Sequence, residues 1–341
     1  MTDPTLTVCI PNYNHGRFIG QALESVLSQS VPATEIIVID DASTDDSIAV
    51  IERYAQEHPS IRLITKPSNK GVFDSVAAGL SLAQGEYFYL LAADDHVLPG
   101  FFERTISLLR EHPKAGMCAV ALKFIDPHGA EIPRENLPAF HTHLEDARDA
   151  GPLLDPAAVL KRLERQPWFL GGVSAVMFRR AAFAEAGGLV GELGLYADWF
   201  APHYVALKYG MCYASEPLSA FRIMPNSFGS AIVMRPRVSF EQAAATLHRM
   251  EEPQYASIFP RWFIEQKRRD FTYSSLRGAL VNWQTTFLAD VSELVPRRGI
   301  MARALFALLR LTRNLQWLLL KIYCRGRVAV PLQPRGDTRA R

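Results

Sequence analysis

The sequence predicts an α/β protein with a mainly parallel central sheet that carries helices on both faces. Over the first 125 residues, short β-branched apolar runs alternate with segments whose apolar residues recur at helical spacing. Strands that alternate with helices are typical of parallel sheets, because each parallel pair needs a crossover connection. The chain has 341 residues and is 48% hydrophobic, so it can bury a substantial core.

Each element of this part follows from composition and spacing. Apolar runs rich in β-branched or aromatic residues predict strands at 6–10, 36–39, 62–65 and 87–91. Apolar residues at helical spacing predict helices within 18–27, 48–54 and 76–80. Further helices are expected at 101–109 and 199–208.

Polar side chains gather where three of these strands end. The first strand is followed by PNYN, the second by DDASTD and the fourth by AADD, which contains Asp94 and Asp95. Ligands of such sheets bind outside the carboxyl ends of the strands. Two Asp pairs near one rim repel each other, and a divalent cation or a hydrogen-bonding ligand relieves that repulsion.

Helix capping is the structural alternative for each acidic position. Asp41 or Ser43 would cap the helix that follows the second strand, because Asp and Ser accept hydrogen bonds from free backbone N–H groups. Asp94 and Asp95 would form a turn and cap before the helix at 101–109. Asp198 would cap the helix at 199–208.

Composition excludes some partners and locations. A net charge of +2 gives nucleic-acid binding no support. Four widely spaced cysteines indicate buried reduced thiols. The N-terminus shows no signal peptide pattern, so we expect a cytoplasmic chain.

Three stretches resemble the nucleotide-sugar half of family 2 glycosyltransferases of the GT-A fold. They are VCIPNYNHGRFIGQALESVLSQSVPATEIIVIDDASTDDS, then SNKG, then GEYFYLLAADDHVLP, in that order over roughly residues 5 to 125. The resemblance continues more weakly to about residue 230. It implies a nucleotide-sugar donor and, as cofactor, Mg²⁺ or Mn²⁺.

The resemblance also implies donor-site roles for particular residues. Asp41 matches the residue that hydrogen-bonds a uracil-type ring, Asp94 would reach the ribose or sugar, and Asp95 would bind the metal that bridges the diphosphate. Carboxylates suit that task, because the ion neutralises charge on the leaving diphosphate. The positions that match segments near the nucleotide are Pro11 and Tyr13 beside the nucleobase and Asn69, Lys70 and Gly71 in the NxG turn.

Asp198 matches the general base of the family, about a hundred positions beyond the metal motif. Partial burial beside aromatic neighbours would raise its pKa and make it a better base. Three departures remove side chains that many members have: Ala92 stands for Asp, Ala197 for Glu and Met224 for His. They put the metal dependence of this chain in question.

The chain divides into four parts on this interpretation. Residues 1–125 form the nucleotide-sugar half, 126–230 the acceptor half with the base, 231–327 a C-terminal helical region and 328–341 a disordered tail. The expected acceptor contacts are Trp168, Gly172, Trp199 and Arg222. Core packing is the alternative for Trp168, and a surface salt bridge for Arg222.

Basic and apolar residues alternate at helical spacing in residues 297–327. The segment is too interrupted to span a bilayer, which takes about 20 apolar residues. It suits a basic amphipathic helix on the anionic inner face of a membrane. Packing of the same face on the enzyme itself or on a second subunit of a homodimer is the open alternative.

Together these features predict an inverting glycosyltransferase. It would move a sugar from a UDP- or dTDP-linked donor to a hydroxyl of a bacterial-type cell-surface glycan or lipid-linked saccharide. A catalytically silent glycan-binding or scaffold protein is one alternative, which Ala92 and Ala197 favour. A sugar nucleotidyltransferase is the other, although IPNYNHGRF lacks the glycine-rich basic phosphate loop that such enzymes usually carry.

Overall fold

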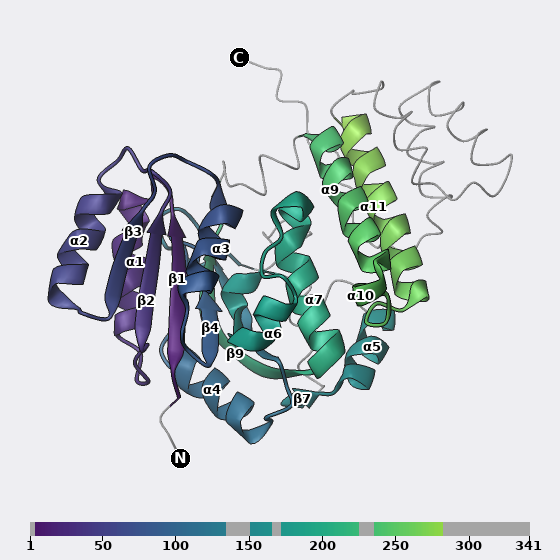
Figure 1. The fold of residues 1–341 in the computed structure, drawn as a ribbon, viewed down its shortest axis with the longest axis horizontal. Helices are drawn as coiled ribbons and strands as arrows, with labels where there is room; N and C mark the ends of the chain where they lie inside the picture. Colours follow the sequence, from purple (N-terminus) through teal and green to yellow (C-terminus); the bar gives the residue numbers. More distant parts are fainter. Residues whose placement is uncertain (1–3, 134–150, 166–171, 225–234, 282–341) are drawn as a thin grey trace, which may run out of the picture.

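The computed structural model describes residues 4–133, 151–165, 172–224 and 235–281 and confirms the α/β fold class (Figure 1). One nine-stranded sheet has the order β3-β2-β1-β4-β8-β6-β9-β5, and β7 pairs with β9. The strands are β1 (Leu6–Asn12), β2 (Glu35–Asp40), β3 (Ile61–Thr65), β4 (Tyr87–Leu90), β5 (His96–Val97), β6 (Met117–Ile125), β7 (Leu153–Leu154), β8 (Val176–Arg179) and β9 (Met211–Arg222).

The N-terminal half of the sheet is parallel, as predicted, and the other half is mixed. Strands β3, β2, β1 and β4 run in one direction, and Asn12 pairs with Asp40 at the ends of β1 and β2. Strand β8 runs antiparallel to both β4 and β6. The residues just before β8 therefore lie at the same sheet edge as the carboxyl end of β4.

Helices cover both faces of the sheet. They are α1 (Gly16–Leu27), α2 (Ser47–Glu57), α3 (Val72–Leu82), α4 (Phe101–Glu111), α5 (Pro156–Arg165), α6 (Arg180–Glu185), α7 (Ala197–Tyr209), α9 (Pro236–Glu251), α10 (Pro253–Ala256) and α11 (Arg261–Val281). Two short 3₁₀ helices are η4 (Val173–Ala175) and η5 (Gly191–Tyr196).

Side chains alternate between the two faces of the sheet along each strand and pack into two separate hydrophobic cores. In β1, Val8 packs into the core under α1, α2 and α4, whereas Cys9 packs into the core under α3, α6 and α7. In β4, Tyr89 and Phe88 divide in the same way. Successive strand side chains point to opposite faces, so a strand buried on both sides reads as a continuous apolar run.

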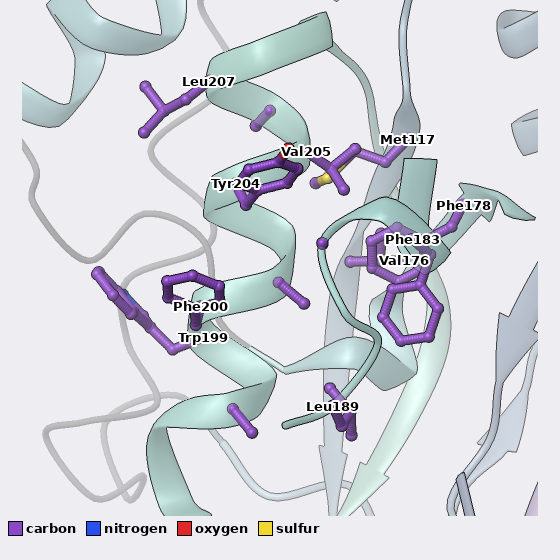
Figure 2. Packing of buried hydrophobic residues seen from close by; sticks show 14 of the residues in the cluster. Met117, Val176, Phe178, Phe183, Leu189, Trp199, Phe200, Tyr204, Val205 and Leu207 are labelled. Atoms are coloured by element: carbon purple, nitrogen blue, oxygen red, sulfur yellow. The ribbon is translucent and has the colours of Figure 1, made fainter. Parts of the chain in front are cut away.

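Helix α7 forms much of the second core. Figure 2 shows Trp199, Phe200 and Tyr204 on this helix, with Val176 and Phe178 of β8 nearby. The C-terminal helices α9 and α11 pack side by side on the outer side of α7 (Figure 1). The C-terminal helical region is therefore seen as far as residue 281.

The predicted amphipathic segment 297–327 and the tail 328–341 lie outside the described residues. Within the described part of the chain, no helix combines the length and the apolar character needed to cross a bilayer.

Candidate active site

Hydrogen bonds lock the ends of β1 and β2 together. Asn12 Nδ2 donates to Asp40 Oδ2 at 2.7 Å, and Ser43 Oγ donates to the same oxygen at 2.6 Å. The backbone N–H of Asn14 donates to Ser43 Oγ at 2.9 Å. Tyr13 lies between these anchored residues and is 43% exposed, so its ring is displayed at the rim where a nucleobase contact is predicted.

Asp41 ties the end of β2 to the turn before α3. Its Oδ1 accepts the backbone N–H of Lys70 at 2.9 Å, and its Oδ2 accepts that of Gly71 at 2.7 Å. Lys66 Nζ donates to Asp41 Oδ1 at 3.0 Å, and Asn69 Oδ1 accepts from the N–H of Gly71 at 3.0 Å. The predicted NxG turn is thus built around the predicted uracil-binding carboxylate.

The acidic turn is buried at the end of β4. Asp95 is 2% exposed; its Oδ2 accepts from Ser174 Oγ and its Oδ1 from the backbone N–H of Arg222, both at 2.8 Å. Burial, and then the neighbouring charge of Asp94, raise the pKa of Asp95 above its usual range. Asp94 remains half-buried beside it. Two neighbouring carboxyl groups therefore lie together at this turn, and a bound cation would favour their ionised forms.

Two of the capping alternatives are wrong. Neither Asp41 nor Ser43 caps helix α2, since the carboxylate of Asp41 bonds to the NxG turn and the hydroxyl of Ser43 to Asp40. The N-cap residue is Asp46. Helix α4 follows Gly100, which has no side chain to cap it, and Asp95 bonds to Ser174 instead.

Arg222 holds the acidic turn from inside the protein. Its Nε donates to the backbone oxygen of Asp94 at 2.8 Å, and its other nitrogens donate to Asp126 O at 3.1 Å and Gln21 Oε1 at 2.9 Å. The residue is 3% exposed. The acceptor contact at Arg222 stays a prediction, and in this structure three internal oxygens bond to its guanidinium.

Asp198 is the second residue of α7 and lies in its first turn, two residues after the N-cap residue, Tyr196. Its half-buried position raises the pKa of its carboxyl to about 6, and hydrogen bonds from the backbone of Asp198 and Trp199 oppose that rise. Asp198 does not occupy the N-cap position, which belongs to Tyr196, although its carboxylate accepts hydrogen bonds from backbone N–H groups of the first turn, as the capping alternative expects. A carboxylate with this pKa is largely ionised at neutral pH yet basic enough to accept a proton.

Two contacts connect the helix of Asp198 with the sheet edge. Helix η4, whose Ser174 donates to Asp95, contacts both β4 and α7. Gly191, at the start of η5, lies so close to Phe73 of α3 that an added Cβ would be 3.3 Å from its side chain. Phe73 follows the NxG turn by two residues. Segments far apart in the sequence therefore meet here: η4 joins the end of β4 to α7, and η5 joins α7 to the start of α3 after the NxG turn.

The other predicted contacts fall in different places. The acceptor contact at Trp199 stays a prediction; the residue is 5% exposed, and its ring stacks on that of Phe263 of α11 at 5.9 Å. Gly172 has φ +74, and a Cβ added to it would meet no atom of the described residues within 4 Å, so these residues leave the space beside it open. Pro11 is half-buried in β1, and Trp168 lies outside the described residues.

The acidic turn fits a divalent cation that a ligand completes. Among the residues that the structure describes, no three His, Cys, Asp or Glu side chains form a group that could hold a metal ion. Mg²⁺, however, is commonly bound by one or two carboxylates together with substrate phosphates and water. Asp95 and Asp94 supply such carboxylates, and each oxygen of Asp95 keeps a lone pair beyond its single hydrogen bond.

Sequence reasoning missed two residues that shape the site. Lys66 neutralises Asp41, and its position directly after β3 was a usable signal, since strand ends line this edge. Ser174 bonds to Asp95 across 79 residues of sequence, and nothing local marks it.

Comparison with known proteins places these features in a family context. A model of the family described as glycosyl transferase family 2 matches residues 7–185, more than half of the chain. An uncharacterized protein of Mycobacterium tuberculosis, MT1568, is 31% identical over 64% of this chain and 67% of its own length. A chondroitin synthase of Escherichia coli is 29% identical over 37% of this chain, which spans only 18% of that relative's length.

Solved structures share the fold. TarS 1–349 of S. aureus in complex with UDP-GlcNAc aligns with a TM-score of 0.63 and 16% identity, over 96% of this chain and 93% of the TarS chain. The mannosyltransferase PcManGT of Pyrobaculum calidifontis, in complex with GDP-Man and Mn²⁺, aligns with a TM-score of 0.56 and 16% identity, over 95% of this chain and 86% of its own.

Proposed function

This chain belongs to glycosyl transferase family 2 and is a glycosyltransferase with the GT-A fold, and on that premise we propose an inverting transfer from a nucleoside-diphosphate sugar. The acceptor is a hydroxyl of a cell-surface glycan or lipid-linked saccharide. One observation carries the proposal: Asp198, with its pKa raised to about 6, lies on the helix that packs against the Ser174 segment beneath Asp95.

The donor half binds the nucleotide at the sheet edge. Tyr13 and Pro11 border the nucleobase, Asp41 contacts its ring, and the turn at Asn69 and Lys70 closes that corner. The exposed ring of Tyr13 and the internal bonds of Asp41 support this assignment, because they leave a rigid rim with an aromatic face. A UDP- or dTDP-linked sugar fits the resemblance, and solved structures of the same fold hold UDP-GlcNAc and GDP-Man.

Asp95 would hold the metal, and Asp94 would reach the ribose or the sugar. Mg²⁺ or Mn²⁺ supplies positive charge that stabilises the leaving diphosphate. The burial of Asp95 beside Asp94 supports this role, since burial and the neighbouring carboxylate disfavour the ionised form of Asp95 and a bound cation would relieve both effects. Arg222 supports the turn through the backbone oxygen of Asp94.

Asp198 acts as the base in a single displacement. Its carboxylate takes the proton of the acceptor hydroxyl while that oxygen forms a bond to the anomeric carbon. The bond from the anomeric carbon to the diphosphate oxygen breaks, and the nucleoside diphosphate leaves with the electron pair. Attack from the side opposite the diphosphate inverts the configuration, and Gly172 leaves open space for the acceptor side.

Replacement of Asp198 by Asn tests the proposal. A thermal-shift panel of UDP, dTDP and GDP and their sugars, with and without Mn²⁺, first identifies a donor that binds. We expect Asp198→Asn to bind that donor normally and to lose transfer by about a thousandfold or more, because the proton acceptor is removed. The matched control is Asp155→Asn, which changes an exposed carboxylate that bonds to the N–H of Ala158.

The pH dependence gives a second readout of the same experiment. Because the base must be ionised, kcat should rise as pH increases through about 6 and then level off. Unchanged transfer by Asp198→Asn would refute the base assignment. Binding without transfer in the unaltered protein, for every donor and saccharide tried, would favour a catalytically silent glycan-binding protein.

A further inference from the structure

The backbone around Asp198 does not fix its own geometry. Four residues after Asp198, Pro202 has no N–H to donate to the carbonyl oxygen of Asp198, so the usual helical hydrogen bond of that turn is missing. Upstream, Gly194 interrupts η5 with φ 49° and ψ −121°. The kink at Gly194 lies before Asp198 and the missing hydrogen bond at Pro202 lies after it. The orientation of the first turn of α7 therefore depends on contacts from other elements.

Helix α9 supplies such a contact at the kink. Gln242 Oε1 accepts the backbone N–H of Leu195 at 3.0 Å. A Cβ added to Gly194 would lie 2.0 Å from the amide carbon of Gln242, so this side chain fills the space that the glycine leaves. Leu195 precedes Asp198 by three residues.

Other contacts from the C-terminal helices act along the same segment. Arg249 Nη1 of α9 pairs with Glu192 Oε1 at 2.7 Å. From α11, the ring of Phe271 lies 4.5 Å from that of Tyr196, and Lys267 Nζ lies 4.9 Å from the ring of Trp199. Gln242 differs from these because it alone, among the contacts named here, binds the backbone between the kink and the helix.

We propose that Gln242 is a positioning residue for Asp198, holding the Leu195 backbone so that the first turn of α7 keeps the carboxylate at the reaction edge. This role rests on the proposed function of Asp198 as base. It makes α9 part of the catalytic unit rather than a peripheral addition to it. Because burial raises the pKa of Asp198, a displacement of this turn toward solvent would lower that pKa.

Gln242→Met tests the hydrogen bond with little change in volume. The matched control is Glu241→Ala, which alters the neighbouring position on α9, where the side chain is exposed and pairs with Arg237. Hydrogen exchange of the peptide covering 191–198 reports the Leu195 contact directly. Carbon-13 NMR of labelled aspartate, assigned with Asp198→Asn, reports the pKa of Asp198 without any substrate.

In Gln242→Met we expect exchange of this peptide to become about tenfold faster, because one backbone hydrogen bond is lost. The pKa of Asp198 should fall from about 6 toward its ordinary value of 3.8. With the identified donor, kcat should fall about tenfold to a hundredfold while the donor KM stays the same. Glu241→Ala should change none of these quantities.

Unchanged exchange and an unchanged Asp198 pKa in Gln242→Met would overturn the proposal. So would a loss of global stability, seen in urea unfolding, that lowers kcat while the Asp198 pKa stays near 6, because that pattern indicates only a structural role. Failure of the proposed function is seen separately, as full transfer activity in Asp198→Asn.

Discussion

Replacement of Asp198 by Asn should stabilise the protein at neutral pH even as it removes the base. The pKa of Asp198 is raised from 3.8 to about 6 by burial, so the folded protein holds the ionised carboxylate less favourably than the unfolded chain does. The stability of the unaltered protein is therefore full below pH 3.8 and falls as pH rises to about 6. Asn resembles the protonated acid and does not incur this loss.

The size of the effect follows from the shift. A shift of one pKa unit corresponds to about 1.4 kcal/mol, so a rise of about two units costs about 3 kcal/mol above pH 6. Because Asp198 is half-buried rather than fully enclosed, solvent reduces this to about 2 kcal/mol. For a chain of 341 residues that corresponds to a rise in Tm of roughly 3 °C.

Urea unfolding and thermal melts at two pH values measure this difference. At pH 7.5, Asp198→Asn should exceed the unaltered protein in free energy of unfolding, whereas at pH 4 the two should nearly agree. Asp155→Asn serves as the control, since its carboxylate is exposed. A variant that is less stable at pH 7.5, or equally more stable at both pH values, would refute the link between burial and the raised pKa.

Two further substitutions test how the site is held together. Lys66→Met removes the cation that bonds to Asp41 at 3.0 Å, so we expect the Kd of UDP, measured by calorimetry, to rise about tenfold. Lys114→Met, at an exposed position, is the control, and equal Kd values for the two variants would contradict this role of Lys66. Arg222→Lys loses the fork that reaches three separate oxygens, which should lower the free energy of unfolding by about 2 kcal/mol in urea. An equal loss in Arg237→Lys, at an exposed position, would contradict that role.

The sequence by itself determined the fold class and the location of the acidic residues. Strands and helices alternate with clear periods, and each of the four predicted strands appears within two residues of its expected bounds. Parallel neighbours end at one edge, so Asp41 and Asp95 could be placed there from local patterns alone. No local sequence pattern predicts that β8 runs antiparallel to β4 and β6, because the packing of the whole sheet determines which strands pair.

Only the tertiary structure decided how individual side chains are used. Arg222 and Trp199 read from the sequence as acceptor contacts, yet both are buried, because a long side chain can turn inward or outward from the same backbone position. Ser174 reaches Asp95, and Gln242 reaches Leu195, across 79 and 47 residues of chain. Contacts of that range depend on how helices pack against the sheet, and no local period or spacing in a sequence encodes them.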